Sequence, residues 1–181
     1  YEQRNKVVLV DFWTYSCVNC IRTLPYVVEW DKKYRDKGLV IVGVHTPEFN
    51  FEKEYDNVQQ ALDKYGIEYP VVQDNNYDTW RAFKNRYWPH KYIIDHEGYI
   101  RYDHIGEGNY EETEKVIQEL LNELGADTSE VIINNEKETT RTFGQTPELY
   151  AGYDFALPRD QDLGNDIGMQ AGETTEYVLP E

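Results

Sequence analysis

Cys17 and Cys20 are the two cysteines of this 181-residue chain, and both lie in the stretch DFWTYSCVNC. A disulfide between cysteines separated by two residues closes a very short loop, so it constrains little of the unfolded chain and adds little stability. Such a pair is suited to reversible chemistry, because one thiolate can attack a disulfide and the other thiol can then displace the bound partner. The spacing therefore predicts thiol–disulfide exchange.

The residues around the pair predict different roles for the two thiols. Residues 6–12 (KVVLVDF) are apolar and rich in β-branched side chains, which predicts a buried strand, and helical spacing follows the cysteines as far as Gly38. Cys17 would then lie at a helix N-terminus, where unpaired backbone N–H groups and the helix dipole favour an anion. We expect Cys17 to be the reactive thiolate and Cys20, one turn deeper, to resolve the mixed disulfide.

Zinc binding, haem attachment and plain burial are the other uses that a cysteine pair can have. A zinc site would need further ligands, but the chain has no second cysteine pair and its four histidines lack an HxxxH spacing, so we predict no metal ion. Haem attachment would need a histidine after Cys20, where Ile21 stands. An inert pair that is buried only as two small apolar side chains remains an alternative.

The rest of the chain predicts an α/β domain. A strand at 39–45 after the first helix gives a parallel strand–helix–strand unit, and Pro25 should kink that helix. Its inward face is expected to carry Ile21, Leu24, Val28 and Trp30. The further elements expected from the pattern are a helix at 51–66, a strand at 68–73, a helix at 76–86, a hairpin of strands at 90–96 and 99–105, and a helix at 109–125.

Charge and composition limit the partners and suggest a domain boundary. The net charge of −16 argues against nucleic acid and against an anionic membrane surface as partners. Residues 126–181 hold 12 acidic and 3 basic residues without clear periodicity. We therefore predict a domain at 1–125 and, at 126–181, a largely irregular acidic extension or the start of another module. The chain opens almost inside a strand, which suggests a piece of a longer protein.

Three stretches carry a resemblance to the thioredoxin superfamily: VLVDFWTYSCVNC, NRYWPHKYIID (85–95) and IRYDHIGEGNYEETEKVIQ (100–118). They are most similar to the TlpA- and ResA-like branch, and within it to the thioredoxin-like domain of DipZ-type proteins, which follows a CcdA-like membrane domain. The resemblance implies a thioredoxin fold, with a central mixed β-sheet flanked by helices. Ser16 departs from the tryptophan usual in thioredoxins, and Val-Asn between the cysteines departs from Gly-Pro.

The resemblance also implies roles for residues near the thiols. Pro89 stands where the family has a cis-proline that faces the cysteines, and Trp88 before it would present its backbone to an extended client peptide. Asp11 matches the acid that handles the proton of the second cysteine, and burial would raise its pKa. The alternative for Pro89 is an ordinary turn proline, and for Asp11 a carboxylate that caps a strand end.

An acidic residue and three aromatic residues complete the predicted site. In ResA-like proteins an acid near the position of Glu48 lies close to the cysteines, although a solvated loop acid is the alternative here. Trp13, Tyr15 and Trp88 are expected to form an apolar rim around the thiols. For Trp13, plain packing in the core is an equally good interpretation.

The function expected from these observations is a thiol–disulfide oxidoreductase that works without a cofactor beyond the Cys17–Cys20 disulfide. The resemblance implies an extracytoplasmic, membrane-tethered protein that passes electrons from a CcdA-like membrane donor to oxidised client proteins. A thiol peroxidase is one alternative, since Thr14-x-x-Cys17 matches part of the peroxiredoxin pattern, but Val10 stands where that pattern has proline. A redox-inert binding module with the same fold is another.

Overall fold

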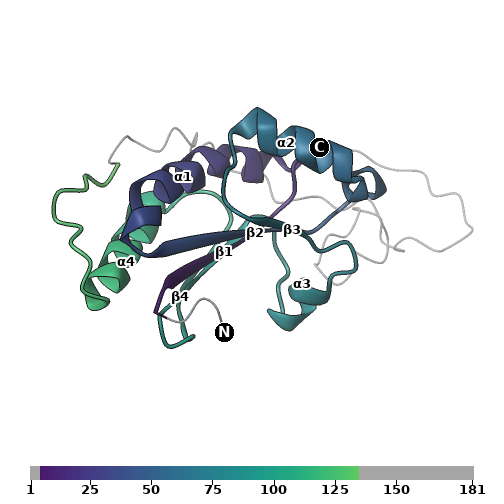
Figure 1. The fold of residues 1–181 in the computed structure, drawn as a ribbon. Coiled ribbons are helices and arrows are strands. Elements are labelled where there is room, and N and C mark those ends of the chain that lie inside the picture. Colours follow the sequence, from purple (N-terminus) through teal and green to yellow (C-terminus); the bar gives the residue numbers. More distant parts are fainter. Residues whose placement is uncertain (1–4, 135–181) are drawn as a thin grey trace, which may run out of the picture. The chain divides into compact units, whose positions relative to one another are not determined.

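The computed structural model describes residues 5–134, which form one mixed sheet with helices on both faces (Figure 1). The five strands lie in the order β3-β2-β1-β4-β5. Their bounds are β1 Val7–Trp13, β2 Leu39–His45, β3 Val71–Gln73, β4 His90–Ile94 and β5 Ile100–Ile105. The helices are α1 Val18–Tyr34, α2 Tyr55–Tyr65, α3 Asp78–Ala82 and α4 Tyr110–Glu123, with short 3₁₀ turns at η1 Arg35–Lys37 and η2 Asn50–Lys53.

The central strand β1 pairs with β2 in parallel and with β4 in antiparallel orientation. Its sequence VVLVDFW is apolar at almost every position, as expected for a strand covered on both faces. The parallel β1–α1–β2 unit and the antiparallel β4–β5 hairpin are both confirmed. The carboxyl-terminal ends of the parallel strands β1 and β2 lie at the edge of the sheet where α1 begins.

Each face of the sheet has its own core. One face packs against α1, α4 and the end of α2, and its buried side chains include Leu9, Trp13, Leu24, Trp30, Ile41, Ile93, Ile117 and Leu121. The opposite face packs against α3, through Val10, Phe12, Val44 and Tyr92 with Trp80 and Phe83. Alternate residues of β1 serve the two cores, since successive side chains of a strand point to opposite faces. Asp11 shares the parity of Leu9 and Trp13, so it faces α1.

Helix α1 places the cysteines at its first turn. It runs unbroken through Pro25 as far as Tyr34, and Gly38 then turns the chain into β2 with a left-handed φ of 110°. Its buried face carries Cys20, Leu24, Val27, Trp30 and Tyr34. The expected inward position of Val28 is thus taken by Val27, and Val28 is only partly buried against the core.

The predicted helix at 51–66 is wrong in its first turn. Residues 50–53 form the 3₁₀ turn η2, Glu54 is extended, and α2 begins only at Tyr55. The cause is Glu52, which is fully buried and accepts hydrogen bonds from the backbone N–H groups of Glu48 and Phe49 at 2.6 and 2.8 Å. These contacts fix a tight loop instead of a continuous helix. The predicted strand at 68–73 and helix at 76–86 are present but shorter.

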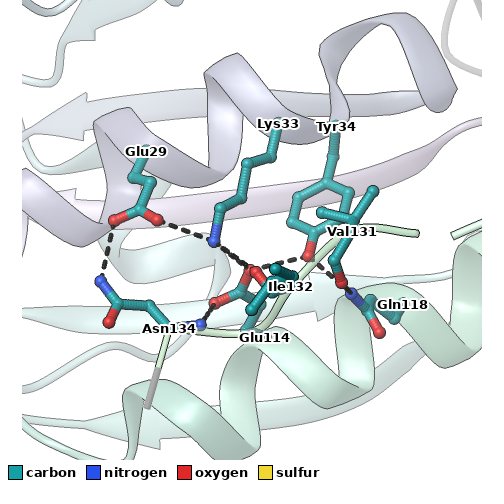
Figure 2. Close-up of polar contacts among 8 residues, drawn as sticks. All are labelled: Glu29, Lys33, Tyr34, Glu114, Gln118, Val131, Ile132 and Asn134. Carbon is teal, nitrogen blue, oxygen red and sulfur yellow. Dashed lines mark hydrogen bonds and ion pairs between the residues drawn. The ribbon is translucent and has the colours of Figure 1, made fainter. Parts of the chain in front are cut away.

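Residues 126–134, beyond the predicted boundary at Gly125, contact α1 and α4 through polar groups (Figure 2). Buried Glu114 accepts hydrogen bonds from Lys33 Nζ at 2.9 Å, from the Tyr34 hydroxyl at 2.7 Å and from the backbone N–H of Asn134 at 3.3 Å. Lys33 also donates to the carbonyl oxygen of Ile132, and Gln118 to that of Val131. We call these residues the Glu114 cluster. The boundary at Gly125 stays a prediction, and most of the predicted extension lies outside the described residues.

Candidate active site

Three loops meet around the cysteines: residues 14–17 after β1, residues 46–52 after β2, and residues 85–89 before β4. The Trp88 side chain donates from Nε1 to the carbonyl oxygen of Thr46 at 2.9 Å, which joins the second and third loops. The Tyr15 hydroxyl donates to the carbonyl oxygen of Phe51 at 3.1 Å, which joins the first and second. The site is thus built from strand ends that the sheet holds side by side.

Cys17 is the N-cap residue of α1 and is partly exposed, and its Sγ lies 4.0 Å from the carbonyl oxygen of Trp88. No side chain caps this helix end, so its amides are available to a negatively charged sulfur. The pKa of Cys17 is lowered to about 7, first by a hydrogen bond from the Cys20 thiol and then by the N–H groups of Cys20 and Asn19, against burial and the charge of Glu48. A large thiolate fraction therefore exists near neutral pH.

Cys20 is buried, and burial raises the pKa of its thiol well above the ordinary value. Asp11 is buried beside it on β1, and its pKa is raised to about 6 because desolvation outweighs the opposing charge of Lys91. The negative charge of Asp11 raises the pKa of Cys20 further. The predicted burial and raised pKa of Asp11 are confirmed, and its position suits a group that accepts the proton of Cys20.

The Trp88–Pro89 peptide bond is cis, as predicted. Pro89 is buried at the entrance of β4, and its carbonyl oxygen accepts a hydrogen bond from the Gly106 amide at 2.8 Å. Trp88 is partly buried, and its ring lies 4.1 Å from that of Trp80 between centroids. The backbone of Trp88 is therefore held next to Cys17 from one side by the hydrogen bond from Gly106, which follows β5, and from the other by aromatic packing.

The predicted aromatic rim is only partly correct. Trp13 is fully buried with its ring edge-on to His45, so the prediction that it lines the rim is wrong, because no client could touch it. Tyr15 is partly exposed and stacks on His45 at 5.5 Å between ring centroids. Burial lowers the pKa of His45 to about 4, so a neutral imidazole supports the loop before Cys17. Its Nε2 lies 3.3 Å from the Thr14 hydroxyl oxygen.

Glu48 is exposed, and its charge raises the pKa of Cys17, so it lies close enough to act on the thiol electrostatically. The buried acid of the same loop is Glu52, which the sequence analysis missed. Besides the two amides of its own loop, Glu52 accepts a hydrogen bond from the Ser16 hydroxyl at 2.5 Å. Through this bond the Glu52 carboxylate holds Ser16, the residue that directly precedes the nucleophile Cys17.

Lys91 is the second residue that the sequence analysis missed. It lies in β4 directly opposite Asp11, and its side chain is fully buried. Lysine is very rarely buried unless it is paired, so a lysine inside the apolar stretch HKYII was an available signal. Burial lowers the pKa of Lys91, and the negative charges of Asp11 and Cys20 oppose that shift.

Comparison with known proteins identifies the class. The family model described as Redoxin matches residues 1–121, so the chain belongs to the Redoxin family. A solved structure of a thiol:disulfide interchange protein DsbE, described as putative, from Chlorobium tepidum superposes with a TM-score of 0.60 at 24% identity, covering 66% of this chain and 83% of that one. The predicted thioredoxin fold, with a mixed sheet flanked by helices, is confirmed.

Two curated relatives place the chain more narrowly. It is 46% identical over 151 residues to the protein DipZ of Mycobacterium tuberculosis, a match that covers 82% of this chain and 22% of DipZ. It is 30% identical to the thiol–disulfide oxidoreductase YkuV of Bacillus subtilis, covering 65% of this chain and 79% of YkuV. The predicted resemblance is confirmed: the homologues include thiol–disulfide oxidoreductases, and the chain spans about a fifth of the length of DipZ.

Proposed function

We propose that this domain is a thiol–disulfide oxidoreductase that reduces disulfides in client proteins through Cys17 and Cys20. The observation that carries the proposal is the asymmetry of the two thiols. Cys17 is partly exposed, with its pKa lowered to about 7, whereas the pKa of buried Cys20 is raised. An attacking thiol is most effective when its pKa lies near the ambient pH, because thiolate fraction and nucleophilicity are then both substantial.

The reaction has two exchange steps. The Cys17 thiolate attacks one sulfur of a client disulfide, a Cys17–client bond forms, and the other client sulfur leaves as a thiolate that takes a proton from water. Cys20 then gives its proton to Asp11 and attacks the Cys17 sulfur, which forms the Cys17–Cys20 disulfide and releases the second client sulfur as a thiolate. The client gains two electrons and the cysteine pair loses two. Trp88 and the backbone before Pro89 would hold the client chain beside Cys17.

The relatives support the finer parts of the proposal. Similarity to DipZ supports a membrane thiol relay of the CcdA type as the electron donor and a site of action outside the cytoplasm, with a membrane tether in the complete protein. Within residues 5–134, no helix is long and apolar enough to cross a bilayer. The redox centre would be the cysteine pair alone, without a bound cofactor.

Reduction of insulin disulfides by the dithiol protein tests the activity. The wild-type protein should reduce insulin, Cys17→Ser should be inactive, and Cys20→Ser should accumulate a mixed disulfide that gel electrophoresis without reductant detects. The reduction potential of the pair tests the direction. A value near that of thioredoxin, about −270 mV, supports a reductase, whereas one near about −120 mV would contradict it.

The peroxidase alternative makes an opposite prediction for one variant. A thiol peroxidase with Cys17 as its peroxidatic residue should still consume peroxide with dithiothreitol when Cys20 is changed to serine. The oxidoreductase proposed here should show no such consumption above the background of free thiols. Peroxide consumption by Cys20→Ser that is lost in Cys17→Ser would overturn the proposal.

A further inference from the structure

Lys91 and Asp11 form a buried pair of opposite charges behind the redox centre. The two residues are direct partners in the antiparallel β1–β4 register, so their side chains lie on the same face of the sheet, the face covered by α1. Both side chains are almost completely shielded from solvent, with exposed fractions of 0% for Lys91 and 1% for Asp11. Lys91 Nζ donates one hydrogen bond, to the carbonyl oxygen of Gly106 at 3.1 Å. A buried charge of either sign is costly unless another charge balances it.

The other strand next to Asp11 offers no such partner. On β2 the residue opposite Asp11 is Gly43, which has no side chain. A Cβ atom at Gly43 would lie 3.0 Å from Trp13 Nε1 and 3.2 Å from the ring of Tyr69, so those two rings occupy the space. Asp11 Oδ1 accepts no hydrogen bond within residues 5–134. The cation that balances Asp11 therefore comes from β4.

The charges of the cluster can be counted through the resolving step. The titratable groups that face it are Asp11 of β1, Lys91 of β4, Cys17 and Cys20 of α1, and Tyr69 before β3. With Cys17 in a mixed disulfide and Tyr69 neutral, the resting cluster holds a carboxylate and an ammonium group, so its net charge is zero. After the proton moves from Cys20 to Asp11 it holds a thiolate and an ammonium group, and the net charge is again zero.

Without the ammonium group, the same proton transfer would move a single uncompensated negative charge through the protein interior. Burial lowers the pKa of Lys91, the charges of Asp11 and Cys20 oppose that shift and favour the ammonium form, and Lys91 in turn lowers the pKa of Asp11. Because Lys91 is fully buried, it does not contact the client. Its contribution is to keep both the proton acceptor and the developing nucleophile ionisable.

We propose that Lys91 is a positioning residue of the redox centre, whose buried ammonium group keeps Asp11 ionised before the resolving step and balances the Cys20 thiolate during it. This inference rests on the proposed function and refines its second step. Cys17 attack on the client does not involve Lys91. The two steps therefore respond differently when the lysine is changed.

The test measures the two steps separately by rapid mixing with a small aromatic disulfide, from pH 5 to 9. In Lys91→Met, formation of the mixed disulfide should stay within about twofold of wild type, while resolution at pH 7 slows by about tenfold, which corresponds to about 1.4 kcal/mol of lost stabilisation of the developing Cys20 thiolate. The midpoint of the pH profile of resolution should move upward from about 6, where the pKa of Asp11 lies.

Lys91→Arg should recover most of the rate. Lys64→Met, which removes an exposed lysine of α2, is the matched control for net charge.

The Asp11→Asn background shows whether the lysine acts through Asp11. There, Lys91→Met should slow resolution by no more than about twofold further, because residues that act as a unit are not additive. An unchanged midpoint in folded Lys91→Met, or full additivity with Asp11→Asn, would overturn the proposal. Absence of the first step in the wild-type protein would instead overturn the proposed function.

A measurement on the wild-type protein decides the matter if Lys91→Met does not fold. The nitrogen chemical shift of Lys91 Nζ, followed by NMR, should show a protonated amine at pH 7 and a change with a midpoint near pH 6 as Asp11 titrates. That change should be absent in Asp11→Asn. A neutral Lys91 amine at pH 7 would exclude the proposed role.

Discussion

The Ser16 hydroxyl donates a hydrogen bond of 2.5 Å to Glu52 Oε1, across 36 residues of sequence. This contact joins the residue that precedes the nucleophile to the loop between β2 and α2. Glu52 also accepts the amides of Glu48 and Phe49, so one buried carboxylate holds both loops. A serine in place of the usual tryptophan before the first cysteine thus has a structural role in this chain.

Glu52→Ala is expected to lower the free energy of unfolding by about 2–3 kcal/mol, because buried hydrogen-bond donors lose a charged acceptor. Burial acts to raise the pKa of Glu52, but its hydrogen bonds, led by those from Ser16 and Thr14, hold that pKa below the ordinary value. Its stabilisation is therefore present above pH 4.5 and lost as the pH falls through the lower pKa of the folded state. Urea unfolding of Glu52→Ala and of exposed Glu54→Gln at pH 7 and pH 4 checks this, and equal stabilities of the two variants would contradict it.

The pH dependence of Cys17 alkylation should report its electrostatic surroundings. In the wild-type protein the iodoacetamide rate should rise with a midpoint at about pH 7. Cys20→Ala should move the midpoint upward, since the Cys20 thiol is the main group that lowers the pKa of Cys17, and Glu48→Gln should move it downward by removing a negative charge. Glu54→Gln serves as a control with an unchanged midpoint. An upward movement in Glu48→Gln would show that Glu48 does not act on the thiolate in this way.

Asp11 should make the reduced protein less stable as the pH rises. Its pKa of about 6 in the folded protein exceeds the ordinary 3.8, so the folded state holds the proton more tightly than the unfolded chain. The resulting stabilisation is complete below about pH 4 and is lost as the pH rises through about 6, a change of roughly 2–3 kcal/mol. The difference in unfolding free energy between wild type and Asp11→Asn should therefore shift by this amount in favour of the variant between pH 4 and pH 8. A constant difference would mean that Asp11 is ionised over this whole range.

The Glu114 cluster should contribute more to stability than an exposed ion pair of the same helix. Glu114→Ala removes the acceptor of Lys33 Nζ and the Tyr34 hydroxyl and should cost about 2–4 kcal/mol. Glu111→Ala breaks only the exposed pair with Lys115 and should cost no more than about 1 kcal/mol. Thermal and urea unfolding of both variants measure the two effects. Similar losses would show that the buried carboxylate has no special role.

Much of the architecture could be predicted because its signals are local. The strands β1 and β2 are apolar stretches with β-branched side chains, and the Cys-x-x-Cys pair marks the start of α1 by itself. The cis peptide before Pro89 followed from the family resemblance, since nothing in the residues alone distinguishes it from a turn proline. For the two strands and the start of α1, local periodicity and a specific motif were sufficient.

What could not be predicted depends on contacts between distant residues. Lys91 and Glu52 look like ordinary charged residues until strand register or loop folding places them beside Asp11 or Ser16. Trp13 was expected at the rim because it is aromatic and near Cys17, but its place in the pleat of β1 directs its side chain into the core. The burial of a residue at a strand end is decided by what covers the sheet there, which one sequence does not reveal.

The contacts of residues 131–134 bear on how the redox unit could be prepared recombinantly. A truncation after Gly125 would deprive Gln118 and Lys33 of the carbonyl acceptors at Val131 and Ile132, and Glu114 of the Asn134 amide. A shortened chain should therefore retain at least Asn134, or the packing of α4 onto α1, on which the placement of the cysteine pair depends, will be weakened.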